Sequence, residues 1–115
     1  MRRIEVVVIV GENAISMQSG TNLYAQIHDL LKSGERVELD FAGIQLFASP
    51  FFNASIGLLL KDIDVNVLQS LLKVVNLDKV GHQLLNHVIA NAIKFYDKDS
   101  RTADAIKSIK NDPEE

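Results

Sequence analysis

Three histidines are the side chains of this sequence that most readily suggest metal binding or acid–base catalysis. They are His28, His82 and His87. His82 and His87 are five residues apart, whereas two metal ligands on one helix need a separation of three or four residues. No carboxylate joins them in a recognisable motif. We therefore expect histidines at the solvent-facing rims of helices, and neither a metal site nor a catalytic one.

The arrangements that serve phosphate binding or nucleophilic catalysis are missing as well. The turn Gly11–Ala14 lacks the glycine series and the lysine of a nucleotide-binding loop. Ser49 is followed by Pro50, so the next residue has no backbone N–H for an oxyanion hole. The absence of cysteine excludes disulfides and thiol catalysis. We expect a protein that is not an enzyme and needs no cofactor.

Two polar side chains flank the end of the second predicted strand, where open α/β sheets place functional groups. Asp40 either accepts backbone hydrogen bonds in the turn or contacts a partner. Ser49 is predicted as the N-cap of the next helix, with Pro50 as its first residue. A phosphate on Ser49 would meet free N–H groups and the positive end of the helix dipole. A structural role and a switch role are thus both open for Ser49.

Three of the five phenylalanines, Phe47, Phe51 and Phe52, surround the same turn. Because a narrow helical stripe cannot bury both Phe51 and Phe52, we predict that Phe52 enters the core. Phe51 then either lies over the turn or is an exposed aromatic anchor for a partner.

Strands and helices alternate along the chain and would position these residues. The β-branched run Ile4–Val10 predicts a strand covered on both faces. The alternation in Arg36–Phe41 predicts the second strand, and the third is expected at about residues 71–76, after a helical turn near 64–69. Residues 64–76 also fit a helix throughout. We predict one small α/β domain with a mostly parallel sheet of three or four strands.

Apolar residues at helical spacing predict three main helices. The first begins after Ser16, or after Thr21 in a shorter version. The second begins at Pro50, and the third runs from Asp78 to Tyr96. We expect the domain to occupy residues 1–96. Residues 97–115 are expected to be a charged tail or a weakly docked helix, with the apolar positions Ala103, Ile106 and Ile109.

Charge and hydropathy restrict the location and the partners. With 12 basic and 15 acidic residues the net charge is −3, which gives no attraction for nucleic acid or anionic lipid. The apolar run at the start is interrupted by Glu5 and is too short for an export signal. We expect a cytoplasmic protein.

Two segments carry a family resemblance: Val37–Ile44, which contains the Asp-Phe-x-Gly turn, and Ala48–Gly57. Together with Ala14–Ser16 and Val74–Leu77 they resemble the bacterial STAS-like domains, relatives of the anti-sigma-factor antagonist (STAS) domain. The likeness spans roughly residues 4–96. It implies a small α/β docking module that acts by binding and not by catalysis.

The resemblance also implies a partner and a site. In antagonist domains a loop reading Asp-Ser-Ser-Gly is phosphorylated on one serine by an ATP-binding anti-sigma-factor or histidine-kinase-like partner. Here Ala48 stands at the aspartate and Pro50 at the second serine, so only Ser49 keeps a hydroxyl. The partner-binding residues expected on this basis are Asp40, Phe51, Asn53 and Ser55.

Two other functions compete with a regulatory docking module. One is a small-ligand or nucleotide-binding domain that uses the turns Gly11–Asn13, Ala48–Ser49 and Asn76 at the carboxyl ends of the strands. The other is a structural or self-associating subunit, such as a homodimer. A pocket beside those turns with convergent donors would favour the ligand, and an exposed Phe51 on a flat or convex patch would favour docking.

Overall fold

The computed structural model describes residues 1–96, which contain a three-stranded parallel sheet in the order β1-β3-β5. Its strands are β1 (Arg2–Glu5), β3 (Val37–Asp40) and β5 (Leu72–Val75). A second, parallel pair consists of β2 (Asn13–Ala14) and β4 (Leu46–Phe47). The predicted α/β class with a mostly parallel sheet is confirmed.

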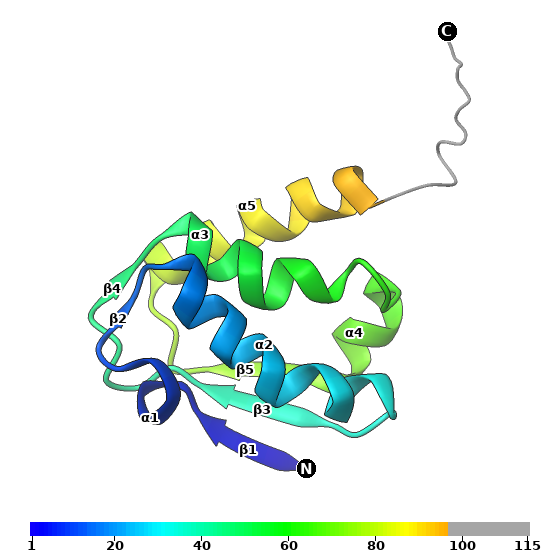
Figure 1. Ribbon diagram of the computed structural model, residues 1–115, viewed down its shortest axis with the longest axis horizontal. Coiled ribbons are helices and arrows are strands. Elements are labelled where there is room, and N and C mark those ends of the chain that lie inside the picture. Colours follow the sequence, from blue (N-terminus) through cyan, green and yellow to red (C-terminus); the bar gives the residue numbers. More distant parts are fainter. Residues whose placement is uncertain (97–115) are drawn as a thin grey trace, which may run out of the picture.

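The helices connect these strands in sequence order (Figure 1). The helical segments are α1 (Val6–Val10), α2 (Met17–Lys32), α3 (Ser49–Phe52), the π-helical segment η1 (Asn53–Gly57), α4 (Val65–Leu71) and α5 (Lys79–Tyr96). The predicted strand after a short helix is confirmed as α4 followed by β5. None of the helices within residues 1–96 has the length and apolar character needed to cross a membrane.

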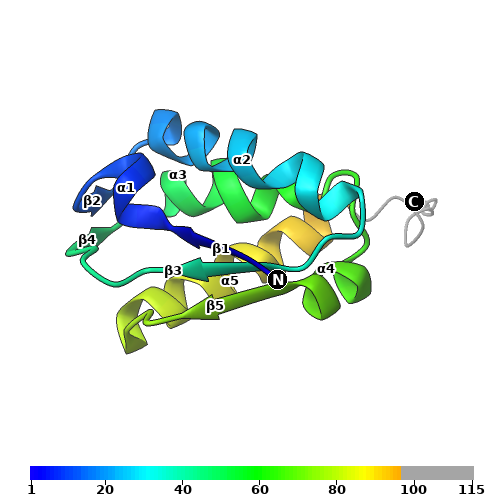
Figure 2. The ribbon, with the colours of Figure 1, turned by 90° about the horizontal axis from the view of Figure 1, so that it is seen from below.

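The helices α2, η1 and α5 cover only one face of the sheet, as the two views in Figures 1 and 2 show. The register aligns Ile4, Leu39 and Val74 on that face, and Leu39 is fully buried. The opposite face carries charged side chains, among them Arg3 and Lys73, which are exposed. The prediction that the first strand is covered on both faces is therefore wrong.

The first strand also lies earlier than predicted. β1 ends at Glu5, which pairs with Asp40, and β3 itself ends there. The following β-branched residues therefore have no strand to pair with, and Val6–Val10 forms a helix whose backbone groups bond internally, as Gly11 N does to Val7 O at 2.9 Å. Val6 is nevertheless buried completely.

The first long helix begins where the longer prediction placed it. Ser16 is the N-cap of α2, and its hydroxyl accepts a hydrogen bond from Ser19 N at 3.0 Å. Gly20 lies on the face of α2 that packs on the next helix: a Cβ there would be 2.4 Å from Phe51 O. The backbones of α2 and α3 thus approach each other so closely that no side chain fits between them at Gly20.

The segment α3–η1 lies between α2 and the rest of the core, so it is buried on several sides. Phe51 and Phe52 are both fully buried. The ring of Phe52 stacks on Phe47 with centroids 5.7 Å apart and lies 6.1 Å from Phe41. The prediction that only Phe52 enters the core fails because a central helix can bury more than one stripe.

The last described element, α5, is the longest helix within residues 1–96. Asp78 accepts a hydrogen bond from Gly81 N at 2.7 Å at the start of α5, as expected for its capping role. Leu85 and Val88 of this helix are buried. The tail or docked helix predicted for residues 97–115 lies outside the described residues.

Candidate functional site

The small sheet β2–β4 brings the beginnings of α2 and α3 together. Ala14 pairs with Phe47, and Ala48 N donates to Ala14 O at 3.0 Å. Gln45 N donates to Glu12 O at 2.7 Å, which ties the turn after α1 to the loop before β4. Figure 2 shows this pair beside α1, at the end of the molecule toward which the three long strands point.

Ser49 lies at this end, although not in the predicted position within its helix. The N-cap of α3 is Ala48, which has an extended backbone and no side-chain cap. Ser49 is the first helical residue and Pro50 the second. The prediction of Ser49 as N-cap is therefore wrong by one residue. Its half-buried side chain has no capping task, and its role as a switch stays a prediction.

Asp40 is held by donors from three parts of the domain. Its Oδ1 accepts from Ala42 N at 2.9 Å and from Asn76 Nδ2 at 2.8 Å, and its Oδ2 pairs with Arg3. The Asn76 hydrogen bond, followed by that of Ala42 and with the charge of Arg3 in addition, holds the pKa of Asp40 below its ordinary value. The turn-carboxylate role is confirmed.

Asn76 owes its position to an unusual backbone conformation. Its φ is 59°, in the left-handed region that asparagine tolerates better than most residues. This conformation ends β5 and directs the carboxamide to Asp40 on the neighbouring strand. Asp40 and Asn76 therefore join the ends of β3 and β5.

Two of the predicted partner-binding side chains are inaccessible. Phe51 and Ser55 are fully buried, and the Ser55 hydroxyl donates to Phe51 O at 2.8 Å. The prediction that they contact a partner is wrong for the folded domain, because neither side chain reaches the surface. Asn53 is exposed but lies on η1, in a groove with α5. Its partner role stays a prediction.

Sequence reasoning missed three exposed apolar side chains near Ser49, which we call the apolar patch: Ile15, Met17 and Leu46. Their side chains are 40%, 67% and 56% exposed. Leu46 belongs to β4, which pairs with β2. Ile15 directly follows β2, and Met17 is the first residue of α2. Spacing in the sequence could not reveal the patch, because only the β2–β4 pairing brings these segments together.

The histidines do not form a common site. His82 and His87 are exposed, as predicted. His28 differs, since its ring lies 2.8 Å from Asp62 and 3.0 Å from Asp29, and it stacks on Tyr24. Within residues 1–96 no group of three metal-ligating side chains gathers in a way that could hold an ion.

Fold and site together define a small α/β domain with a one-sided parallel sheet, in which three of the exposed apolar side chains, Ile15, Met17 and Leu46, belong to the segments that the β2–β4 pair joins. The model of a family described as "STAS-like domain of unknown function (DUF4325)" matches residues 19–82, more than half of the chain. The chain belongs to this family. The match extends from α2 to the first turn of α5. Comparison with curated proteins and with solved structures gave no match.

Proposed function

We propose that this STAS-like domain is a non-enzymatic regulatory module that docks on a protein partner through the beginnings of α2 and α3. The observation that carries this proposal is the apolar patch of Ile15, Met17 and Leu46 beside Ser49. Exposed apolar side chains that gather at one place are typical of interaction surfaces. In this proposal the apolar patch takes the place of the buried Phe51 as the apolar contact with the partner.

The nature of the partner is proposed from the family resemblance. In antagonist domains the loop at this position contacts an ATP-binding anti-sigma or histidine-kinase-like protein, and we propose a partner of that class. Ser49 is the hydroxyl at this loop and is not needed as a helix cap. A negative charge on Ser49 would therefore change the docking surface without removing a capping hydrogen bond.

The alternative of a small-ligand site has less support from the turns that would form it. The polar groups of these turns bind one another: Asn76 donates to Asp40, and Glu12 O accepts from Gln45 N. A ligand would have to compete with these contacts. An apolar surface at the same end favours a protein partner instead.

Calorimetric titration of the protein against a purified ATP-binding, anti-sigma-like protein from the same genome tests the proposal. Met17→Asp and Leu46→Asp should each weaken binding about tenfold or more, because a charge replaces an apolar contact that is worth over about 1 kcal/mol in an interface centre. Val67→Asp on α4 is the matched control, since Val67 is 47% exposed and lies outside the patch. It should bind as the unmodified protein does.

Ser49 is tested separately in the same titration. Ser49→Asp should change the affinity at least several-fold, and Ser49→Ala should leave it close to that of the unmodified protein. Equal affinity for both Ser49 variants would reject the switch and leave the docking surface intact. Equal affinity for the Met17, Leu46 and Val67 variants, or no binding at all, would reject the docking proposal.

A further inference from the structure

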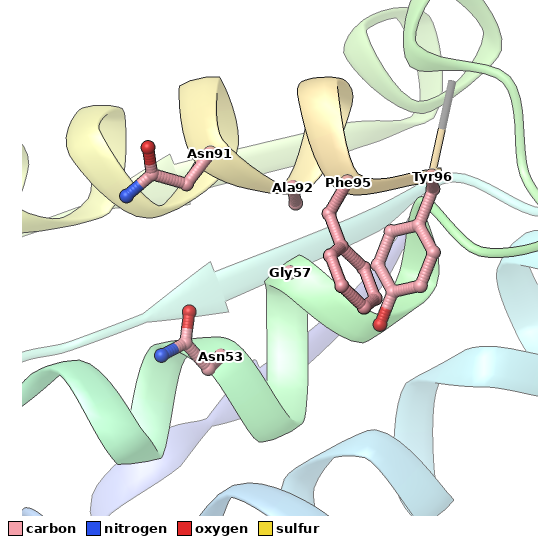
Figure 3. A pocket seen from close by; sticks show the side chains of 6 residues that line it. All are labelled: Asn53, Gly57, Asn91, Ala92, Phe95 and Tyr96. Carbon is pink, nitrogen blue, oxygen red and sulfur yellow. The ribbon is translucent and has the colours of Figure 1, made fainter. Parts of the chain in front are cut away.

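The second half of α5 and the π-helical segment η1 enclose a groove that the proposed docking site does not use. Its volume is about 330 Å³. Figure 3 shows the six residues that line it: Asn53, Gly57, Asn91, Ala92, Phe95 and Tyr96. In this view the rings of Phe95 and Tyr96 extend from α5 toward η1, and the carboxamides of Asn53 and Asn91 lie at the other end.

The close packing of the two helices at a glycine gives the groove its floor. A Cβ at Gly57 would lie 3.1 Å from Val88 Cγ1 and 3.9 Å from Ala92 Cβ. Any larger residue at position 57 would therefore press against α5. Gly57 and Ala92, the small residues of this contact, both line the groove.

The lining favours a peptide segment over a charged ligand, because none of the six lining residues is charged. Phe95 is 79% exposed, and its ring meets that of Tyr96 edge to face at 5.0 Å. The carboxamides of Asn53 and Asn91 can each donate and accept hydrogen bonds, as a peptide backbone requires. The volume lies near the lower limit of about 300 Å³ for ligand pockets, which suits a few apolar side chains.

We propose that the groove binds the chain's own C-terminal segment, residues 97–115, with Ile106 and Ile109 against Phe95. Three observations point to this occupant. The segment starts directly after Tyr96, which itself lines the groove. Its apolar residues recur at every third position, as Ala103, Ile106 and Ile109, a spacing that would bring them to one face of a helix formed on binding. The linkage to the domain gives the segment a high effective concentration at the groove.

The connection is long enough for the segment to reverse its direction. Six residues, 97–102, separate Tyr96 from Ala103, and in extended form they span up to roughly 20 Å. The lining residues of α5, from Asn91 to Tyr96, extend over only about 7.5 Å of helix. Ala103, Ile106 and Ile109 can therefore reach the whole length of the groove.

The absence of cysteine makes the full chain suitable for a single spin label. A nitroxide on Asn111→Cys should broaden the backbone amide signals of Gly57 and Ala92 several-fold more than that of Val67 on α4. The additional exchange of Ile106 and Ile109 for Asp should abolish this difference. So should Phe95→Asp, whereas Val80→Asp is the matched control, because Val80 is 67% exposed at the start of the same helix.

Several outcomes would overturn the proposal. Broadening that is equal at Gly57 and Val67, or that is strongest at the apolar patch, would place the segment elsewhere. Broadening of isotope-labelled, unmodified chains by spin-labelled chains without isotope would identify a second copy as the occupant. Persistence of the effect in both the Ile106/Ile109 and the Phe95 variants would exclude the proposed contact. The amide spectrum of each variant also shows whether the domain is folded.

Discussion

Ser16 and Ser49 stand at the beginnings of two neighbouring helices and have different structural tasks. Ser16 precedes α2, and its hydroxyl accepts the hydrogen bond of Ser19 N. Ser49 is already inside α3, and Ala48 takes the capping position without a side-chain acceptor. The sequence suggested a cap at both serines, because serine is a common N-cap residue. At Ser49 the following Pro50 also suggested this position, since proline is common as the first helical residue.

This difference predicts unequal effects of two alanine substitutions on stability. Ser16→Ala should lower the free energy of unfolding by about 0.5–2 kcal/mol, the usual effect of losing a cap. Ser49→Ala should change it by less than about 0.5 kcal/mol, as expected for a position without such a contact. Urea unfolding of both variants measures the difference. An equal loss in both would show that the Ser49 hydroxyl also stabilises its helix.

The role of Asp40 was predictable in part. An aspartate before a glycine-containing turn is typical of a carboxylate that accepts backbone N–H groups, and Ala42 N provides this bond. Its contacts with Asn76 and Arg3 depend on the order β1-β3-β5, which places both neighbouring strands beside it. A sequence without known strand pairing cannot supply these partners.

At the scale of the elements, α2, β3 and α5 were predictable because each has a clear apolar period or cap. Residues 64–76 also fitted a helix, so β5 was expected only because alternating strands and helices need a third strand before the last helix. The run Val6–Val10 was not, although its β-branched residues favour a strand. A strand needs a partner of matching length, and β3 offers pairing only as far as Asp40. The end of β1 is thus determined by the length of β3 and not by the β-branched run Val6–Val10.

The contact between α2 and α3 predicts a strong effect of a single methyl group. In Gly20→Ala the Cβ would lie 2.4 Å from Phe51 O and 2.8 Å from Ala54 Cβ. Backbone shifts to relieve this overlap should cost about 1–3 kcal/mol, more than the gain of up to about 1 kcal/mol in helix propensity. The midpoint of urea unfolding should fall. Thr21→Ala, at an exposed neighbouring position, is the control, and a stabilised Gly20→Ala variant would contradict the close packing.

His28 connects α2 to the turn after η1 and makes stability depend on pH. Its hydrogen bonds with Asp62, and secondarily with Asp29, raise its pKa above the ordinary 6.5. The protonated form is thus favoured in the folded state. The resulting stabilisation is complete below the unfolded pKa and is lost as the pH rises through the higher folded pKa.

Replacement of His28 by glutamine should remove the part of the pH dependence of stability that arises from this histidine. The free energy of unfolding of the unmodified protein should decline as the pH rises above 6.5, and that of His28→Gln should decline less. Urea unfolding over a pH series measures both slopes. His82→Gln, which changes an exposed histidine on α5, should retain the slope of the unmodified protein. Parallel curves for all three proteins would refute the role of His28.

At the scale of the whole molecule, the alternation of strands and helices was sufficient to predict the α/β class. It could not predict that the helices lie on one face only. That depends on Arg3, Glu38 and Lys73, which the register aligns on the open face although they are 35 residues apart along the chain. The apolar patch escaped prediction for the same reason, because it also arises from pairing between distant segments.

The parallel order β1-β3-β5 also determines how the chain can fold. Arg2 pairs with Val37, and Val37 pairs with Leu72, so each pairing within this sheet closes a loop of 35 residues. Such long loops must lose much conformational entropy before any strand contact stabilises them, which slows folding. During synthesis β1 can pair as soon as β3 has left the ribosome, but the sheet is complete only when β5 follows. The central strand β3 therefore acts as the template on which the earlier and the later halves of the chain are assembled in turn.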